Sequence, residues 1–213
     1  VQTCALPIYE SWGLNTIKSG HAYSICKSLF CTKCHLLFLD IRFSEAELGN
    51  LYADYRGPEY TKLRDQYEPG YRMRNEGLKS GIGYIPAVES FLEPHVDHPL
   101  SILDWGGDTG KNTPFKDENT KLDIFDISDI DVIPGAKIVN KKEAQSNKYK
   151  LVVCSNVLEH VPYPADLLLD ISLAMDLNSV LYIEVPQENV VLENKTDLHL
   201  HKKHWHEHIN FFT

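Results

Sequence analysis

The second half of this chain alternates short apolar strands with helical or loop crossovers. Strands are predicted at residues 101–104, 121–126, 136–139, 150–155 and 180–185, with an amphipathic helix at 165–175. Short, continuously apolar strands joined by crossovers are typical of a parallel sheet whose two faces are both covered. We therefore predict an α/β fold with a doubly wound, mostly parallel sheet, whose ligands bind beyond the carboxyl ends of the strands.

The first predicted strand runs directly into a glycine turn. Asp104 ends this strand, and Gly106, Gly107 and Gly110 follow it. Glycine lets a backbone approach a ligand closely and adopt a positive φ. Asp126 ends the second strand, 22 residues after Asp104, where a carboxylate suits the two hydroxyls of a ribose. The combination predicts a Rossmann-like site for an adenosine-containing cofactor; a purely structural turn is the alternative.

The charge of this turn indicates which cofactor it suits. Asp104 and Asp108 flank the glycines, and only Lys111 offsets them. Carboxylates repel the pyrophosphate of a dinucleotide, whereas S-adenosylmethionine has no phosphate and carries a sulfonium and an ammonium group. The sign of the loop therefore favours S-adenosylmethionine over NAD.

The overall charge excludes other classes of partner. The 213 residues include 21 Lys and Arg against 30 Asp and Glu, a formal net charge of −9. Nucleic acids and anionic membranes repel such a protein, so we expect neither as a partner. No stretch approaches the roughly 18 apolar residues of a membrane span, and no signal peptide is recognised at the start. We expect a cytoplasmic protein with a small-molecule acceptor.

Residues 99–213 resemble the class I S-adenosylmethionine-dependent methyltransferases. Residues 102–110 look like the first motif of that family, LDxGxGxG, with Asp108 at its middle glycine. Asp126 resembles the acid of the second strand, residues 149–161 are close to a segment ending in VLEHV, and residues 182–186 look like the fifth strand. The resemblance implies a donor lying over the glycine turn, with Asp126 on its ribose and Asn156 in the turn that lines its pocket.

The end of the chain resembles one subgroup, the sugar C-methyltransferases and their relatives. Residues 205–213 match its EHxxxF segment, and the resemblance implies that Glu207 and His208 deprotonate a sugar, a sugar nucleotide or another small metabolite. A histidine with a pKa near neutrality suits a general base. Two alternatives remain, which are surface histidines without a role and a metal site made of His199, His201, His204, His206 and His208.

Four of the five cysteines lie in the first 34 residues. They are Cys4, Cys26, Cys31 and Cys34, and the fifth is Cys154. The turn of a C-x-x-C pair lets Cys31 and Cys34 reach one zinc ion, for which Cys26, Cys4 or His21 would complete the ligands. The sugar C-methyltransferases also carry a cysteine-ligated zinc lobe before their core. Buried or idle thiols are the alternative, and an odd cysteine count favours a reducing compartment.

Three regions are predicted along the chain. Residues 1–44 form a small Cys-bearing zinc lobe, residues 45–98 a helical, Tyr-rich connection, and residues 99–213 the methyltransferase core. Within the connection, Ser44 and Glu47 form a capping box for a helix over residues 45–55, and another helix covers residues 82–93.

Two functional alternatives come from other classes of protein. One is a Rossmann enzyme that uses NAD or a nucleotide sugar, and the other is a noncatalytic binding module that retains the methyltransferase fold. Members of the resembled family continue with a further helix and an antiparallel strand pair. We therefore expect the chain to be a fragment, with a sheet that is incomplete at its C-terminal edge and an activity that depends on the missing part.

Overall fold

A computed structural model describes residues 28–40, 44–52, 57–67, 70–73, 76, 84–128, 130–187 and 208–212. It divides into two compact units, each containing its own sheet. The larger unit comprises residues 49–155 and 165–184, and the smaller comprises residues 1–48, 156–164 and 185–213. The positions Cys4, Cys26 and Glu207 lie outside the described residues.

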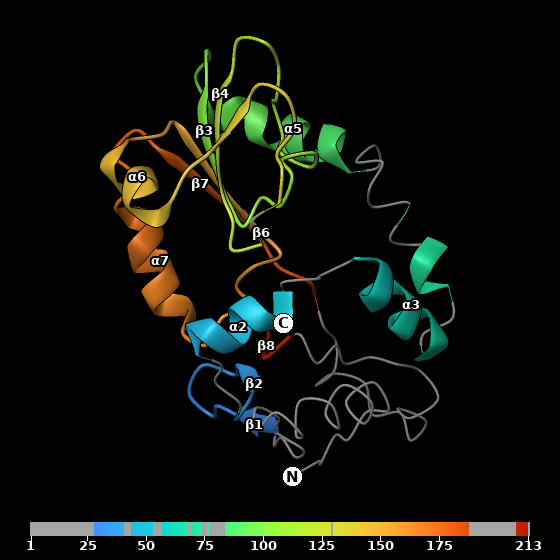
Figure 1. Ribbon diagram of the computed structural model, residues 1–213. Helices are drawn as coiled ribbons and strands as arrows, with labels where there is room; N and C mark the ends of the chain where they lie inside the picture. The colour runs from blue at the N-terminus through green and yellow to red at the C-terminus, as the bar shows by residue number, and fades with distance from the viewer. Residues whose placement is uncertain are drawn as a thin grey trace. The chain divides into compact units, whose positions relative to one another are not determined.

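The larger unit is built on a five-stranded parallel sheet with the order β5-β4-β3-β6-β7 (Figure 1). Its strands are β3 (Ser101–Trp105), β4 (Lys121–Phe125), β5 (Ala136–Ile138), β6 (Leu151–Ser155) and β7 (Val180–Glu184). The direction of the chain reverses across the sheet between β3 and β6, which is the topological switch point of a Rossmann-like fold. The predicted α/β fold with a parallel sheet is therefore confirmed.

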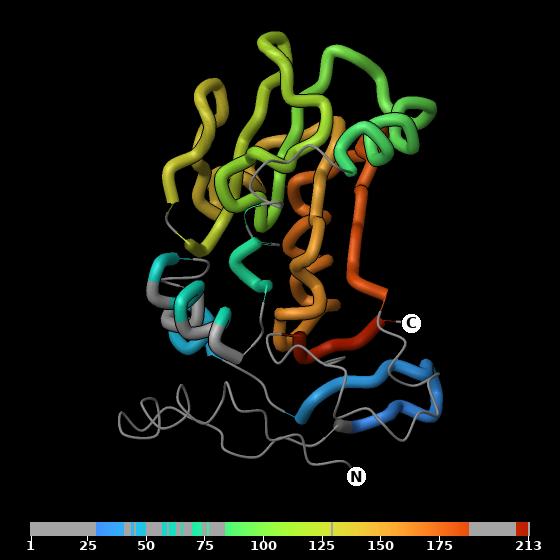
Figure 2. Tube along the Cα trace, turned by 90° about the vertical axis from the view of Figure 1, so that its right-hand side faces the viewer, coloured from blue at the N-terminus to red at the C-terminus, as the bar shows by residue number. Residues whose placement is uncertain are grey.

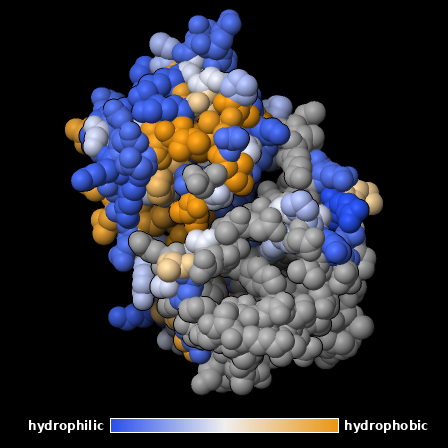
Figure 3. All heavy atoms as spheres, viewed as in Figure 1, coloured by the Kyte–Doolittle hydropathy of each residue, from blue (hydrophilic) through white to orange (hydrophobic). Residues whose placement is uncertain are grey.

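Helices cover both faces of this sheet. In Figure 1, α5 (Ile85–Leu92) lies on one side, and α6 (Lys141–Ser146) and α7 (Pro164–Ser172) lie on the other. Pro86 stands in the first turn of α5, where the missing backbone N–H breaks no hydrogen bond. Figure 3 shows that apolar residues also gather at the surface on the viewed face of this unit.

The core beneath α5 follows from the alternation of side chains along the strands. Ile102, Leu122 and Leu151 are paired in register and belong to one buried cluster with Leu92 of α5. Ile124 and Val153 continue the same cluster two residues further along their strands. Because neighbouring strands are in register, the residues that follow their carboxyl ends lie together at one edge of the sheet.

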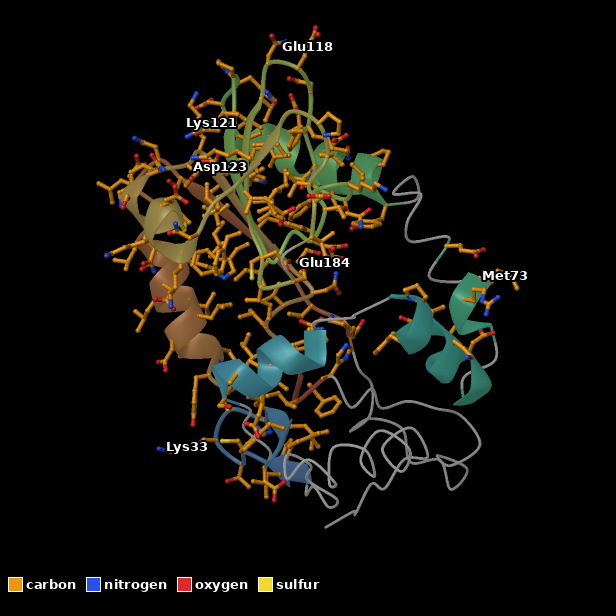
Figure 4. The ribbon with its side chains drawn as sticks, in the orientation of Figure 1. Lys33, Met73, Glu118, Lys121, Asp123 and Glu184 are labelled. Atoms are coloured by element: carbon orange, nitrogen blue, oxygen red, sulfur yellow. The ribbon has the colours of Figure 1, made fainter. Side chains whose placement is uncertain are left out.

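The opposite face of β4 holds a buried carboxylate. Asp123 is 2% exposed, and its Oδ2 accepts a hydrogen bond of 2.7 Å from the Tyr149 hydroxyl. Lys121 Nζ lies 3.3 Å from the same oxygen, and Figure 4 shows both residues on β4. Burial raises the pKa of Tyr149, and its hydrogen bond with Asp123 raises it further. A buried charge that is paired in this way stabilises the fold only while its partners remain.

The smaller unit contains an antiparallel sheet of three strands, β1 (Ser28–Phe30), β2 (Leu37–Leu39) and β8 (Asn210–Phe211). Figure 2 shows the hairpin of β1 and β2 in blue beside β8 in red. Leu37, Leu39, Ile209 and Phe211 form the core of this sheet. The pairing of β2 with the far end of the chain was not predicted from the sequence.

The region predicted as a Tyr-rich connection contains α2 (Glu45–Tyr52), α3 (Pro58–Tyr67), α5 and the short 3-10 helix η1 (Glu93–His95). The capping box is confirmed, because Ser44 N–H donates to Glu47 Oε2 at 2.8 Å and Glu47 N–H donates to Ser44 Oγ at 3.3 Å. Among the described residues, no helix has the length and apolar character that crossing a membrane requires.

Replacing Tyr149 by Phe tests the buried Asp123. We expect Y149F to lower the free energy of unfolding by about 1–3 kcal/mol, because Asp123 loses a buried hydrogen bond that no water replaces. Denaturant unfolding followed by circular dichroism measures this change. Tyr163 is exposed, so Y163F is the matched control and should be neutral. Equal stability of Y149F and the parent protein would contradict this role of Asp123.

Candidate functional site

The glycine turn directly follows β3, and its backbone geometry requires glycine at two positions. Gly106 has a φ of 83°, and its N–H donates to Phe125 O of β4 at 2.7 Å. A Cβ added to Gly107 would lie 2.6 Å from Asp104 Cγ, closer than any real contact. The turn therefore packs directly on the side chain of Asp104. The backbone of Gly107 lies at the carboxyl edge of the sheet.

Asp108 replaces a glycine of the resembled motif, and the structure shows why it fits. Its φ is 51°, in the left-handed region that Asp tolerates better than most residues. Its N–H donates to Asp126 Oδ2 at 2.8 Å, while Ser128 N–H donates to Asp126 Oδ1 at 2.8 Å. Each carboxylate oxygen has a second lone pair. Asp126 is thus fixed beside the glycine turn and keeps acceptor capacity for a ligand.

Asp104 is buried beneath the turn, with 6% of its surface exposed. Thr113 Oγ1 donates to Asp104 Oδ2 at 2.5 Å. Burial is the main cause that raises the pKa of Asp104 to about 7; the charges of Asp126 and Asp108 also raise it, and the hydrogen bond from Thr113 lowers it. Asp104 therefore supports the turn from below. Thr113 is fully buried and was not anticipated, because its spacing matches no motif.

A further polar group at the carboxyl edge lies on β6 and β7. Ser155 and Glu184 are paired in register, and Ser155 Oγ donates to Glu184 Oε2 at 2.9 Å. Tyr182 OH donates to the same oxygen at 3.1 Å. Burial, followed by the charge of Glu184, raises the pKa of Tyr182 to about 12. The only sequence signal for Glu184, labelled in Figure 4, was a carboxylate at the end of a predicted strand.

The smaller unit brings His208 together with the turn that follows β6. Asn156 opens this turn with a φ of 54°. Glu159 is 1% exposed, and its Oε1 lies 3.6 Å from His160 Nε2. The rings of His160 and His208 meet edge to face with centroids 4.8 Å apart. The structure therefore unites His160 and His208, which are 48 residues apart, with a buried carboxylate that sequence reasoning had not selected.

Backbone hydrogen bonds hold this arrangement in place. The carbonyl of Glu159 accepts N–H bonds from Ile209 at 2.7 Å and from Asn210 at 3.0 Å. The buried Asn210 side chain donates to Leu158 O at 3.0 Å and to Val161 O at 2.8 Å. The turn and the start of β8 are thus joined by four hydrogen bonds immediately beside the two histidines.

Cys31 and Cys34 lie in the turn between β1 and β2, and both are free thiols. His35, with a φ of 61°, donates its N–H to Cys31 O at 2.8 Å, which closes the turn. The backbone N–H groups of Cys34 and Lys33, followed by the Cys34 thiol, donate toward Cys31 and lower its pKa. A thiolate stabilised by backbone N–H groups is the form in which cysteine binds metal.

Strand order, glycine turn and the acid after β4 together define a Rossmann-like α/β domain, a class whose ligands bind at the switch point. A family profile described as a methyltransferase domain matches residues 80–213, more than half of the chain, so the chain belongs to this methyltransferase family. No curated protein matches the chain.

Solved structures with a similar fold include the plantazolicin methyltransferase BpumL in complex with desmethylPZN analogues and SAH. The complex with the monoazolic analogue has a TM-score of 0.42 at 15% identity and covers 76% of this chain and 66% of its own. Those with the pentazolic and triazolic analogues both have a TM-score of 0.39, at 16% and 17% identity, and cover 69% of this chain and 62% of their own. The chain thus spans less than two thirds of their length.

The close approach of Gly107 to Asp104 predicts that a side chain at position 107 destabilises the fold. We expect G107A to lower the free energy of unfolding by about 1–3 kcal/mol, because the new methyl group overlaps the buried Asp104 side chain. G49A in α2 is the control, since no atom lies within 4 Å of a Cβ placed there, and alanine favours a helix by about 1 kcal/mol. Chemical denaturation measures both, and a neutral G107A would mean that the turn moves freely over Asp104.

The raised pKa of Asp104 makes stability depend on pH. A folded-state pKa of about 7 lies above that of the unfolded chain, so folded protein holds the extra proton. The free energy of unfolding should therefore fall as pH rises toward about 7, by up to about 1.4 kcal/mol per pH unit, and level off above it. D104N should lack this slope. Denaturant titrations across this range measure it, and equal slopes in both proteins would contradict the assignment.

Proposed function

We propose that this domain transfers the methyl group of S-adenosylmethionine to a small-molecule acceptor. Membership of the methyltransferase family supports the reaction class. The donor would lie over Gly106, Gly107 and Gly110, with its ribose hydroxyls on Asp126. The observation that carries this proposal is the hydrogen bond between Asp108 N–H and Asp126, which presents a carboxylate beside the partly exposed Gly106 and Gly107.

Electrostatics supports S-adenosylmethionine over a dinucleotide. The charges of Asp108 and Asp126 already raise the pKa of Asp104, so this turn is a region of negative potential. A sulfonium and an ammonium group would relieve that repulsion, whereas a pyrophosphate would add to it. The same charge pattern argues against the NAD-dependent alternative.

The acceptor side would be formed by His208, Glu207 and the neighbouring His160. In methyl transfer, the acceptor loses a proton and attacks the methyl carbon, while the carbon–sulfur bond breaks to release S-adenosylhomocysteine. A histidine can take that proton, and a neighbouring carboxylate can orient the imidazole. The contact of His160 with His208 supports a shared role. Asn156, at the end of β6, would contribute to the donor pocket through its backbone.

We extend the proposal to the class of acceptor and to the lobe that carries the cysteines. A sugar or a sugar nucleotide is the acceptor implied by the resemblance of residues 205–213, and the net charge of −9 favours a small acceptor over a nucleic acid. Cys31 and Cys34 would hold a structural zinc ion, with Cys26 and Cys4 as further ligands. The lowered pKa of Cys31 and the closed turn around it fit that ion.

Two variants separate donor binding from turnover. We expect D126A to weaken binding of S-adenosylmethionine by about 10–100-fold, because two charge-assisted hydrogen bonds to the ribose are lost. H208A should bind the donor normally but turn over an acceptor about 10²–10⁴-fold more slowly, because the proton acceptor is missing. Isothermal calorimetry with S-adenosylmethionine and S-adenosylhomocysteine measures binding, and release of S-adenosylhomocysteine measures turnover.

Calorimetry also distinguishes the competing functions. Asp131 is exposed in the loop between β4 and β5, so D131A is the matched control and should bind the donor as the parent protein does. Heat with NAD and none with S-adenosylmethionine would overturn the proposal. Binding of neither ligand would favour a noncatalytic module, and full turnover by H208A would remove the histidine from the mechanism.

A further inference from the structure

We propose that Glu159, His160 and His208 bind one divalent transition-metal ion, with Zn²⁺ as the best match. One carboxylate oxygen and one nitrogen from each histidine all lie within 4.8 Å of one another. The set differs from the five-histidine site considered above, whose other members lie outside the described residues. The inference deepens the proposed function by making His208 a metal ligand in place of a free base, and it rests on that function for the role of the ion in methyl transfer.

The spacing of these atoms is close to that of a metal site. Zinc lies about 2.0–2.1 Å from nitrogen and oxygen ligands, so the edge of a tetrahedron around it is about 3.3 Å. Glu159 Oε1 and His160 Nε2 are already 3.6 Å apart. The widest pair in the set needs to close from at most 4.8 Å, a movement of about 1.5 Å shared between two side chains.

The chemistry of the ligand atoms selects the class of metal ion. Two imidazoles and one carboxylate form the protein ligand set of a class of catalytic zinc sites, which keep a fourth position open. Imidazole nitrogen suits Zn²⁺, Fe²⁺ and related ions, whereas Mg²⁺ and Ca²⁺ prefer oxygen ligands alone. Glu159 is a carboxylate with 1% of its surface exposed, and a cation bound to it offsets the cost of burying its charge.

The surrounding hydrogen bonds hold the ligands before the ion arrives. Glu159 and His160 are adjacent in the turn after β6, and His208 directly precedes the residues that bond to the Glu159 carbonyl. The side chain of Asn210 joins the same turn at Leu158 and Val161. Ligands that are fixed in this way lose little conformational entropy on binding, which favours affinity.

An open coordination position gives the site a chemical use. A hydroxyl oxygen of the acceptor bound there would have its pKa lowered by the ion and would lose its proton to solvent more readily. His208 would then serve as a ligand that activates the acceptor through the metal, in place of acting as a free base.

Metal binding is tested directly on the tag-free chain of 213 residues. The double variant C31S/C34S removes the cysteine pair, so that any remaining zinc must lie elsewhere. After treatment with a chelator, Zn²⁺ is added, and elemental analysis and calorimetry measure its stoichiometry and affinity, with Mg²⁺ as a comparison. We expect one equivalent of Zn²⁺ in C31S/C34S, more in the parent protein if the cysteine pair also binds zinc, and no binding of Mg²⁺ at similar concentrations.

Substitutions then assign the ligands in the C31S/C34S background. Adding E159Q or H160Q should weaken zinc binding at least about 10-fold, whereas H95Q, which changes an exposed histidine of η1, should not. His160 is partly exposed, so H160Q keeps the test valid even if E159Q fails to fold. Absence of zinc from C31S/C34S would overturn the inference. Unchanged affinity in H160Q, or an equal loss in H95Q, would overturn it as well.

The same protein samples separate this inference from the proposed function. Binding of S-adenosylhomocysteine is measured on each variant by calorimetry. Donor binding without zinc binding would leave the methyltransferase proposal standing and remove the metal site. Zinc binding without donor binding would support the metal site and overturn the proposed reaction.

Discussion

The turn over Asp104 is the interaction on which the larger unit depends. Gly107 passes so close to this carboxyl group that no other residue fits, and Thr113 and the turn together shield the group from water. The same turn presents Asp108 N–H to Asp126, which joins the ends of β3 and β4. Burial of one acid thus shapes the backbone against which a cofactor would lie, and repulsion among the three acids favours a positively charged one.

The smaller unit uses one backbone carbonyl in a comparable way. The Glu159 carbonyl accepts two N–H groups from the start of β8, and this places His208 against His160. Main-chain hydrogen bonds therefore set the separation of the two histidine rings. These two histidines can act in general-base catalysis or in metal binding. The proposed function assigns the first role to His208, and the further inference assigns it the second.

Much of the larger unit could be predicted because its signals are local. Five apolar strands, a glycine turn and the acid at Asp126 each lie within a few consecutive residues, and the observed strands begin and end within one or two residues of the predicted bounds. The pairing of β2 with β8 could not be predicted, since two residues carry no periodicity. Glu159 was not selected as a ligand for a similar reason: that role depends on His208, which only the folded chain brings near.

The third strand of the small sheet has a consequence for how the protein is made. Leu37 of β2 pairs with Phe211 of β8, so 174 residues separate the two partners. At about 5–20 residues per second, a ribosome needs roughly 9–35 seconds to deliver β8 after β2 has emerged. During that interval the hairpin exposes an unpaired strand edge and the apolar face of Leu37 and Leu39. The order of synthesis therefore makes this sheet, rather than the larger one, the part most exposed to misassociation and to capture by chaperones.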